Sequence, residues 1–272
     1  MPDLRDCADW IKQADGLLIT AGAGMGIDSG LPDFRGPGGF WAVYPALGKA
    51  RIAFESIANP AAFERDPRMA WGFYGHRLDL YRKTTPHPGF GILLELAENM
   101  KHGAWAFTSN VDGHFQKAGF ASNRVCEIHG SIHHLQCIAG CSQQIWPAAD
   151  FEPQVDADNC RLLSELPHCP QCGQIARPNI LMFGDWGWIE RRTALQQQRL
   201  QQWIAAVDRL VCIEIGAGAQ IPTVRYFSEN CGAKLIRINP GEPEIPQNIS
   251  AFAIAEPGLA GIQQLKQALA ES

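Results

Sequence analysis

The stretch LLITAGAGMGIDSGLPDFRGPGGFW, residues 17–41, contains the pattern that decides the fold. An apolar run typical of a buried strand leads directly into Gly22, Gly24 and Gly26. A dinucleotide-binding fingerprint would place its third glycine three residues after the second, and an acidic residue about twenty residues further on. This stretch has neither feature, and it continues into an acidic, aromatic and basic cluster at residues 33–35. The stretch therefore begins like a nucleotide-binding loop and then departs from the usual pattern.

The composition is that of an ordinary globular protein, with 46% hydrophobic and 19% charged residues and a net charge of −5. No run of Lys and Arg occurs, so a nucleic-acid-binding surface is not predicted. No apolar run approaches the roughly 20 residues that a membrane span needs. The first residues lack a signal-peptide pattern, and nine cysteines without an export signal indicate a reducing compartment. We expect a cytoplasmic protein that binds neither nucleic acid nor membrane.

Four apolar runs alternate with helix-like segments, at residues 16–21, 104–110, 209–218 and 233–240. The first and third runs end in glycine turns, and a short helical pattern that stops at Gly232 separates the last two. A strand, a glycine turn, a helix and a second strand form a βαβ unit. The sequence thus predicts an α/β fold with a Rossmann-like, doubly wound parallel sheet. Ligands of such sheets bind where the carboxyl ends of the strands meet.

Two regions interrupt this alternation. Residues 36–90 are rich in proline, glycine and aromatic residues before they become helical, and residues 131–180 carry cysteine pairs and little helical periodicity. We expect the first to form a helical insertion and the second a zinc-ribbon-like module, and both to build a smaller lobe. The Rossmann-like domain then comprises residues 1–35, 91–130 and 181–272.

Four cysteines have the spacing of metal ligands: Cys137, Cys141, Cys169 and Cys172. Two tight turns that each present two thiolates can complete a tetrahedron around Zn²⁺. Four thiolates leave no open coordination position, so this zinc would stabilise the small lobe and take no part in chemistry. The alternative is two unrelated pairs of buried or redox-active cysteines.

Polar residues occur at the predicted ligand crevice. Asn110 and Asp112 follow a predicted strand at its carboxyl end, although they could instead form a turn that caps the next helix. His129 lies at the seam between the lobes, where ligand sites are common, and an imidazole there can accept a proton from a sugar hydroxyl. A buried core histidine is the alternative. His133 and His134, closer to the cysteines, are expected to be structural.

Together these stretches resemble the motifs of the sirtuin family, the NAD-dependent lysine deacylases. The similarity covers about residues 15–245 and keeps the family's order. The matching stretches are GAGMGIDSGLPDFRG, TSNVDGHFQKAG, EIHG, the four cysteines, RPNILMFGD and INP. One such motif would be weak support, whereas six in the same order are highly specific.

The resemblance implies roles for individual residues. Arg35 would pair with a phosphate of NAD and Phe34 would shield the ribose, while His129 and Asn110 would be catalytic, His129 as the general base. The residues implied to contact NAD are Gly22, Ala23, Gly24, Asp33, Phe34, Arg35, Asn110, Asp112, Gly216, Ala217, Gly218 and Asn239. The channel for the acyl-lysine of a protein substrate would include Ile180, Phe183 and Gly184.

The implied reaction transfers an acyl group from a protein lysine to ADP-ribose and releases nicotinamide. An NAD glycohydrolase or an ADP-ribosyltransferase that uses the same site is the alternative function. A non-catalytic, NAD-responsive binding module is a third possibility. Substitution of His129 distinguishes the three, since only deacylation requires a base after nicotinamide has left.

The sequence also contains a pattern that indicates which acyl group is preferred. Tyr74 and Arg77 are three residues apart on a predicted helix and therefore share one face. In sirtuins that prefer succinyl- or malonyl-lysine, a Tyr-x-x-Arg pair of this kind binds the acyl carboxylate, since Arg binds carboxylates bidentately and Tyr adds a donor. An ordinary amphipathic helix with a packed Tyr and a solvated Arg is the alternative.

The chain departs from the usual sirtuin pattern at several positions. Gly26 stands where Ser is usual, Ser109 where Gln is usual, and Gly-Ala-Gly at residues 216–218 where the turn usually carries hydroxyls. Each lost hydrogen bond to NAD would cost roughly 0.5–1.5 kcal/mol. Trp186 and Trp188 replace a short aliphatic segment, and we expect this pair to narrow the access of peptides or to alter which partner is recognised.

Overall fold

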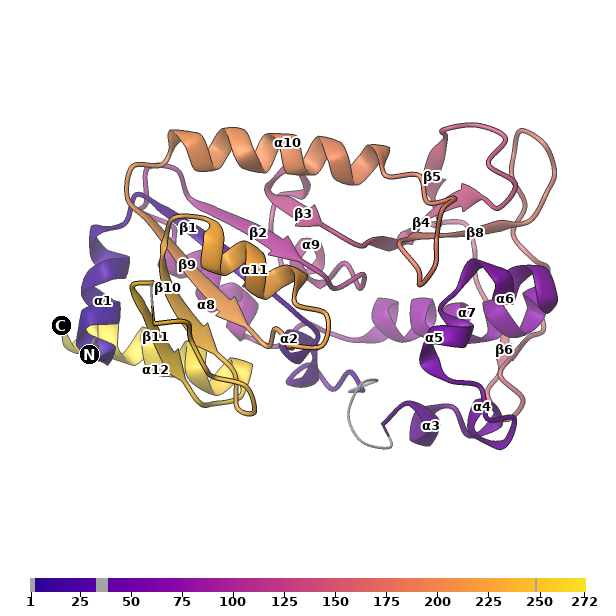
Figure 1. Cartoon of the computed structure of the whole chain (residues 1–272), viewed down its shortest axis with the longest axis horizontal. Helices are drawn as coiled ribbons and strands as arrows, with labels where there is room; N and C mark the ends of the chain where they lie inside the picture. The colour runs from indigo at the N-terminus through magenta and orange to yellow at the C-terminus, as the bar shows by residue number, and fades with distance from the viewer. Residues whose placement is uncertain (1–2, 33–38, 248) are drawn as a thin grey trace.

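The structure is a computed structural model that describes residues 3–32, 39–247 and 249–272, and it consists of two lobes (Figure 1). The larger lobe is built on a six-stranded sheet in the order β11-β10-β9-β1-β2-β3, in which every neighbouring pair is parallel. The strands are β1 (Gly16–Ala21), β2 (Ala104–Thr108), β3 (Val125–Glu127), β9 (Leu210–Ile215), β10 (Lys234–Ile238) and β11 (Ala251–Ile254). This confirms the predicted doubly wound, Rossmann-like sheet.

The four predicted apolar runs form the central strands, whereas the two edge strands were not predicted. β3 and β11 contain only three and four residues, which is too short for a periodic pattern to be recognised. β1 is buried at every position, as expected of a parallel strand that is covered on both faces. Leu17 and Ile19 point into one core and Leu18 into the other.

Helices cover both faces of this sheet (Figure 1). One core lies beneath α1 (Leu4–Gln13), α8 (Gly89–Leu96) and α12 (Gly258–Glu271). The opposite core lies beneath α10 (Arg191–Ala206) and α11 (Thr223–Asn230), where Trp203 packs near Trp105 with ring centroids 5.8 Å apart. Three short elements follow two of the strands: α2 (Gly24–Ile27) follows β1, and α9 (His114–Lys117) and a 3₁₀ turn (Ser122–Arg124) lie between β2 and β3.

The smaller lobe combines helices with a three-stranded antiparallel sheet in the order β5-β4-β8. Its helices are α3 (Gly39–Val43), α4 (Pro45–Lys49), α5 (Phe54–Ile57), α6 (Pro60–Arg65) and α7 (Pro67–Lys83). Its strands are β4 (Gly130–Cys137), β5 (Ile145–Pro147), β8 (Ala176–Ile180) and the hairpin of β6 (Val155–Asp156) and β7 (Arg161–Leu162). A single aromatic-rich core joins these helices and strands, so the two predicted insertions form one lobe.

The longest helix of the small lobe, α7, begins where the sequence predicts. Pro67 occupies its first turn, and the side chain of Asp66 accepts a hydrogen bond of 3.1 Å from the backbone N–H of Met69. Tyr74 and Trp71 of this helix are fully buried in the core. The side chains that α7 directs toward the larger lobe become one wall of the site described below.

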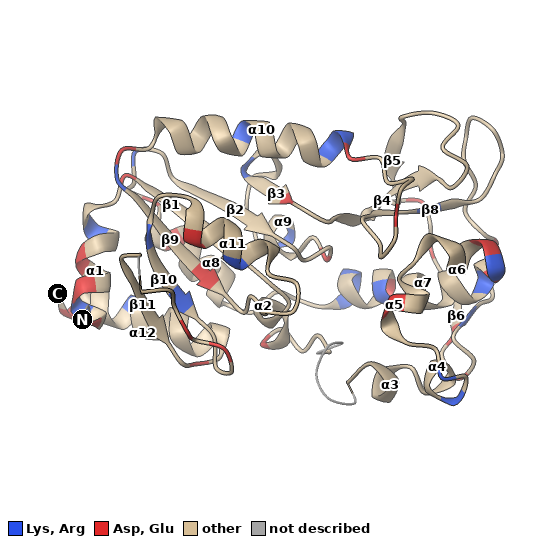
Figure 2. Cartoon of the chain, in the orientation of Figure 1, with Lys and Arg blue, Asp and Glu red and all other residues tan. Residues whose placement is uncertain are grey.

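Charged residues are distributed over both lobes in the described part of the chain and do not gather on one face (Figure 2). None of the helices described combines the length and the hydrophobicity that a transmembrane helix requires.

Gly72 on α7 and Gly91 on α8 provide a test of the packing of the small lobe. A Cβ at position 72 would lie 2.1 Å from the carbonyl oxygen of Cys160, whereas a Cβ at position 91 would meet no heavy atom within 4 Å. We expect Gly72→Ala to lower the free energy of unfolding by about 1–3 kcal/mol through overpacking. Gly91→Ala should raise it by up to about 1 kcal/mol, because alanine is the better helix former.

Urea unfolding of both variants measures this difference. If Gly72→Ala is as stable as Gly91→Ala, then α7 does not pack against the β6–β7 connection as the structure describes.

Candidate active site

Two glycine turns meet at the carboxyl ends of β1 and β9. The N–H of Gly22 donates to the carbonyl of Ile215, and the N–H of Gly24 donates to the carbonyl of Gly216, both at 3.0 Å. A Cβ at Gly22 would lie 2.6 Å from the oxygen of Gly216, and a Cβ at Gly216, where φ is +58°, would lie 2.4 Å from the Cα of Gly24. These positions therefore require glycine so that the two turns can touch.

Asn110 lies beside the first of these turns. Its Nδ2 donates to the carbonyl of Gly22 at 2.8 Å, and its backbone N–H donates to the hydroxyl of Thr108 at 3.0 Å. Asp112 is buried, and its Oδ1 accepts the backbone N–H of His114, the first residue of α9, at 2.8 Å. The structure thus holds both side chains at the carboxyl end of β2, and the capping role considered for Asp112 is present.

His129 lies in the connection between β3 of the large lobe and β4 of the small lobe. Its carbonyl accepts the N–H of Leu181 at 2.9 Å, and the N–H of Ile132 donates to the carbonyl of Val111 at 3.0 Å. The following residue, Gly130, has φ of +79°, and a Cβ there would lie 2.1 Å from the carbonyl oxygen of Asn179. The backbone around His129 is therefore fixed from both lobes.

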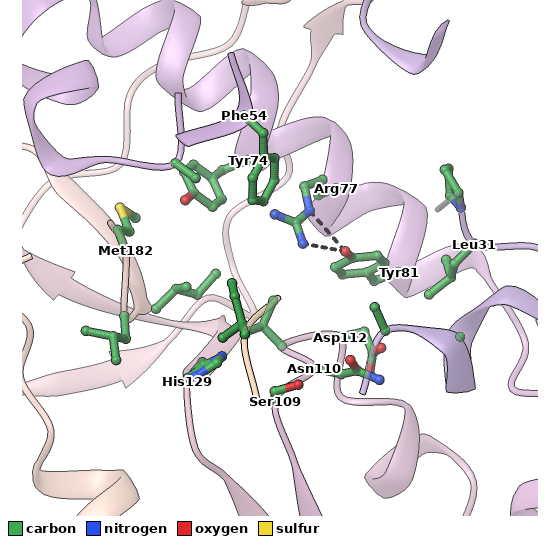
Figure 3. Close-up of a pocket in the computed structure, with 18 of the residues that line it drawn as sticks. Leu31, Phe54, Tyr74, Arg77, Tyr81, Ser109, Asn110, Asp112, His129 and Met182 are labelled. Carbon is green, nitrogen blue, oxygen red and sulfur yellow. Dashed lines mark hydrogen bonds between the residues drawn. The ribbon is translucent and has the colours of Figure 1, made fainter. Parts of the chain in front are cut away.

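A cavity of about 280 Å³ separates the two lobes and brings these residues together. Figure 3 shows Ser109, Asn110, Asp112 and His129 on one side of it, opposite side chains of α7. Its lining consists of Ala23, Gly26, Leu31, Pro32, Phe54, Ala58, Tyr74, Arg77, Tyr81, Ser109, Asn110, Val111, Asp112, His129, Ile180, Leu181, Met182, Phe183 and Ile221. Most of the cavity lining is apolar. The large lobe contributes the carboxamide of Asn110 and the carboxylate of Asp112, and the imidazole of His129 lies where the two lobes join.

The opposite wall comes from α7. The guanidinium of Arg77 lies 5.4 Å from the ring of Tyr81 and donates to its hydroxyl from Nε at 3.0 Å and from Nη2 at 2.7 Å (Figure 3). Burial raises the pKa of the hydroxyls of Tyr74 and Tyr81 above their usual value, although the nearby Arg77 opposes this. Both phenols therefore stay protonated and keep a donor O–H at neutral pH.

Several residues predicted to bind NAD do not line this cavity. Among the described ones these are Gly22, Gly24, Gly216, Ala217, Gly218 and Asn239, and of the predicted channel residues Gly184 does not line it either. The structure places Asn239 at the second glycine turn, where its Nδ2 donates to the carbonyl of Ala217 at 3.0 Å. Asp33, Phe34 and Arg35 lie outside the described residues.

The structure also shows site residues that the sequence analysis missed. Tyr81 follows Arg77 by one helical turn, a spacing that could have indicated it. Arg225 donates from Nε to the carbonyl of Ala217 at 2.9 Å, and Glu242 accepts the N–H of Ala219 at 2.8 Å. These two side chains hold the second glycine turn, which lacks the usual hydroxyls, and no local pattern in the sequence marks them.

The four cysteines of the small lobe form one cluster. Their sulfur atoms all lie within 4.8 Å of one another, with Cys137 to Cys172 at 3.5 Å and Cys141 to Cys169 at 3.6 Å. A tetrahedral zinc with Zn–S bonds of about 2.3 Å requires sulfur atoms about 3.8 Å apart. The four cysteines therefore fit Zn²⁺. This geometry favours one metal site over two unrelated pairs of cysteines.

Comparison with known proteins identifies the family. The chain matches the Sir2 family over residues 22–221. The chain belongs to the Sir2 family. A protein of Pyrococcus furiosus named NAD-dependent protein deacylase is 37% identical over 240 residues, which cover 87% of this chain and 86% of that protein. The mitochondrial NAD-dependent protein deacylase sirtuin-5 of Danio rerio is 32% identical over 246 residues, covering 85% of this chain and 75% of that protein.

Solved structures of Sir2 proteins share the same fold. A Sir2 homologue in complex with NAD has a TM-score of 0.71 at 22% sequence identity, covering 97% of this chain and 93% of that protein. A Sir2 protein with a deacetylated p53 peptide has a TM-score of 0.68 at 19% identity and covers 98% of each chain. The fold of this Sir2-family chain is therefore that of both complexes.

Zinc content tests the cysteine cluster. We expect one zinc per chain by elemental analysis, and loss of most of it in Cys172→Ser. The thermal midpoint should fall at the same time, because the binding free energy of a structural metal stabilises the lobe that forms its site.

Cys231→Ser is the matched control, since Cys231 lies outside the cluster and donates to the carbonyl of Ser228. It should retain the metal. Full zinc content in Cys172→Ser would contradict the assignment of this residue as a ligand.

Proposed function

We propose that this Sir2-family chain is an NAD-dependent protein lysine deacylase. The observation that carries the proposal is the cavity between the lobes, where Asn110, Asp112 and His129 line the border of an apolar chamber. Relatives that share 32–37% of their residues with the chain over most of its length carry the name NAD-dependent protein deacylase. The reaction transfers the acyl group of an acyl-lysine to ADP-ribose.

The donor set of the cavity fits NAD. A carboxamide and a carboxylate next to each other can hydrogen-bond the nicotinamide amide and the ribose hydroxyls. Asn110 and Asp112 take this role in the proposal, with Ala23 at the adjoining glycine turn. When bound, NAD supplies the electrophilic ribose carbon to which the acyl oxygen adds as nicotinamide leaves. Ser109, where Gln is usual, lines the same region.

His129 acts as the general base in this proposal. Its place at the cavity lets the imidazole accept a proton from a ribose hydroxyl. Leu31, Val111 and Met182 line the cavity and exclude water, which protects the reacting carbon from hydrolysis. The hydrogen bond from Leu181 to the carbonyl of His129 ties the base to the channel segment that receives acyl-lysine.

The zinc has a structural role in the proposal. Cys137 lies at the end of β4, and Cys169 and Cys172 lie in the segment before β8, so the metal would fasten the two paired strands of the small-lobe sheet together. None of its four ligands lines the cavity.

Tyr74 and Arg77 support a preference for acidic acyl groups such as succinyl and malonyl. Both line the cavity that also holds His129, so an acyl chain in the cavity meets them. Arg77 is oriented by its two hydrogen bonds to Tyr81 and by the ring of Phe73, 5.2 Å away. An oriented guanidinium beside protonated phenols suits a carboxylate.

The Trp residues that were expected to narrow peptide access do not line the cavity. Trp186 is fully exposed, so its indole fills no part of the chamber. This favours the deacylase over the glycohydrolase or ADP-ribosyltransferase, which would need the acyl route to be closed. A cytoplasmic location belongs to the proposal as well and is supported by the nine cysteines, none of which forms a disulfide in the structure.

An assay with acyl peptides tests the function. Purified protein, NAD and peptides with acetyl-, succinyl- or butyryl-lysine should yield free lysine and O-acyl-ADP-ribose by mass spectrometry. We expect His129→Ala to lower the deacylation rate about 10²- to 10⁴-fold, the usual contribution of a general base.

The thermal midpoint and zinc content of His129→Ala serve as controls for folding. Release of nicotinamide without any deacylated peptide would instead support the glycohydrolase. Full deacylase activity in His129→Ala would contradict the assigned base.

Substitution of Arg77 tests the acyl preference. Arg77→Met should lower kcat/KM for the succinyl peptide about 10- to 100-fold and leave that for the acetyl peptide nearly unchanged. The reason is that a hydrogen bond to a charged group contributes about 1.5–3 kcal/mol.

Lys83→Met is the matched control, because it removes an exposed cation from the same helix. An equal loss with both peptides in Arg77→Met would show that Arg77 supports the fold of α7 and does not select the acyl group.

A further inference from the structure

Trp186 is the most exposed large hydrophobic residue among those described. It lies in the loop between β8 and α10, and its exposed fraction is 100%, compared with 63% for Tyr226 and for Leu163. Tryptophan is the side chain that most often contributes large binding energies in interfaces. Because it is completely exposed, the side chain of Trp186 takes no part in the packing of the described fold.

The loop that carries Trp186 is held in place on both sides of it. Asp185 forms a bidentate ion pair with Arg177 at 2.7 and 2.8 Å, and both side chains are almost completely buried, with 0% and 2% exposed. Oxygens of the same carboxylate accept the N–H of Gly187 at 3.1 Å and of Met182 at 3.3 Å.

Contacts with Gln136 hold the residues that follow Trp186. Gln136 of β4 donates to the carbonyl of Gly187 at 2.8 Å and also accepts the N–H of Ile189 at 3.1 Å. The backbone on both sides of Trp186 is thus fixed to β4 and β8. A partner that binds the indole therefore loses little free energy in ordering this loop.

The loop lies at the border of the acyl-lysine cavity. Trp186 lies three positions after Phe183, which lines the cavity, so their Cα atoms are at most about 11 Å apart. The loop projects toward α5 (Figure 1). There the N–H of Phe183 donates to the carbonyl of Ala58, and the ring centroids of Phe183 and Phe54 lie 6.0 Å apart. A peptide whose lysine enters the cavity therefore passes Trp186 within a few residues.

The segment that precedes Trp186 also exposes apolar side chains. Leu181 and Phe183 are 39% and 36% exposed, and the charge of Asp185 is neutralised by Arg177. We propose that Trp186 is a specificity-determining residue that binds an apolar side chain of the protein substrate within about three positions of the acyl-lysine. The proposal rests on the proposed deacylase function and extends it to the sequence around the modified lysine.

Measurement of kcat and KM with three substrates tests whether Trp186 binds an apolar side chain next to the acyl-lysine. They are a single acyl-lysine with blocked ends, a seven-residue peptide with Ser and Gly around the acyl-lysine, and the same peptide with Leu at every flanking position. In the wild type, kcat/KM should be about tenfold higher for the Leu peptide than for the Ser/Gly peptide.

Trp186→Ala should abolish this difference through a higher KM at unchanged kcat, since the contact forms equally in the ground state and the transition state. Trp186→Phe should keep most of it. Turnover of the single acyl-lysine should be the same in all variants. Leu163→Ala, which removes another exposed apolar side chain from the small lobe, is the matched control and should behave as the wild type.

Three results would overturn the proposal. The first is a Leu preference that persists in Trp186→Ala, and the second is a slower reaction of that variant with the single acyl-lysine, which would assign Trp186 to the fold or the chemistry. The third is a higher kcat/KM of the wild type for a matching peptide with Lys or Arg in place of Leu, if this preference disappears in Trp186→Ala. If the wild type turns over none of the substrates, the deacylase function itself fails, and the proposal fails with it.

Discussion

The contact between the two glycine turns is the constraint on which the site depends. Gly22 and Gly24 at the end of β1 touch Gly216 at the end of β9, and any side chain at these positions would overlap backbone atoms. The neighbouring Asn110 is in turn oriented by the carbonyl of Gly22. The glycines that a nucleotide-binding pattern would assign to phosphate contact thus have a second function, because they let two strand ends approach and fix the backbone that orients Asn110 at the cavity.

The second constraint is the way in which the lobes are joined around His129. The histidine stands between β3 and β4, and its carbonyl accepts a hydrogen bond from Leu181 just after β8. The same segment continues into the loop that the buried pair of Arg177 and Asp185 holds. Breaking a buried ion pair by removal of one partner is strongly destabilising, at about 3–5 kcal/mol. One segment, which begins at Leu181 and runs into the loop of Trp186, therefore connects the proposed base His129, the proposed acyl channel and the exposed Trp186.

The backbone of the second glycine turn is held by side chains from other parts of the large lobe. The hydroxyls that usually follow this glycine are replaced by Ala217 and Gly218. The carbonyl of Ala217 accepts hydrogen bonds from both Arg225 and Asn239, so the turn keeps a fixed backbone without them. Nearby, Arg237 of β10 is fully buried between Glu214 of β9 and Glu229 of α11, which pairs its charge and anchors these two strands to α11. The two side chains that hold the turn, Arg225 and Asn239, lie 8 and 22 positions after Ala217.

The sequence by itself determined the class of fold, the glycine turns, the cysteine cluster and the principal polar residues of the cavity. These follow from patterns within short stretches, such as the apolar run before Gly22 or the spacing of Cys169 and Cys172, in which neighbouring residues constrain each other directly. Only the tertiary structure decided that Gly24 meets Gly216, that Arg77 and His129 line the same cavity, and that Trp186 stands in solvent on a fixed loop. Such contacts join segments that are up to about two hundred positions apart, and they depend on how the lobes pack, which no local periodicity encodes.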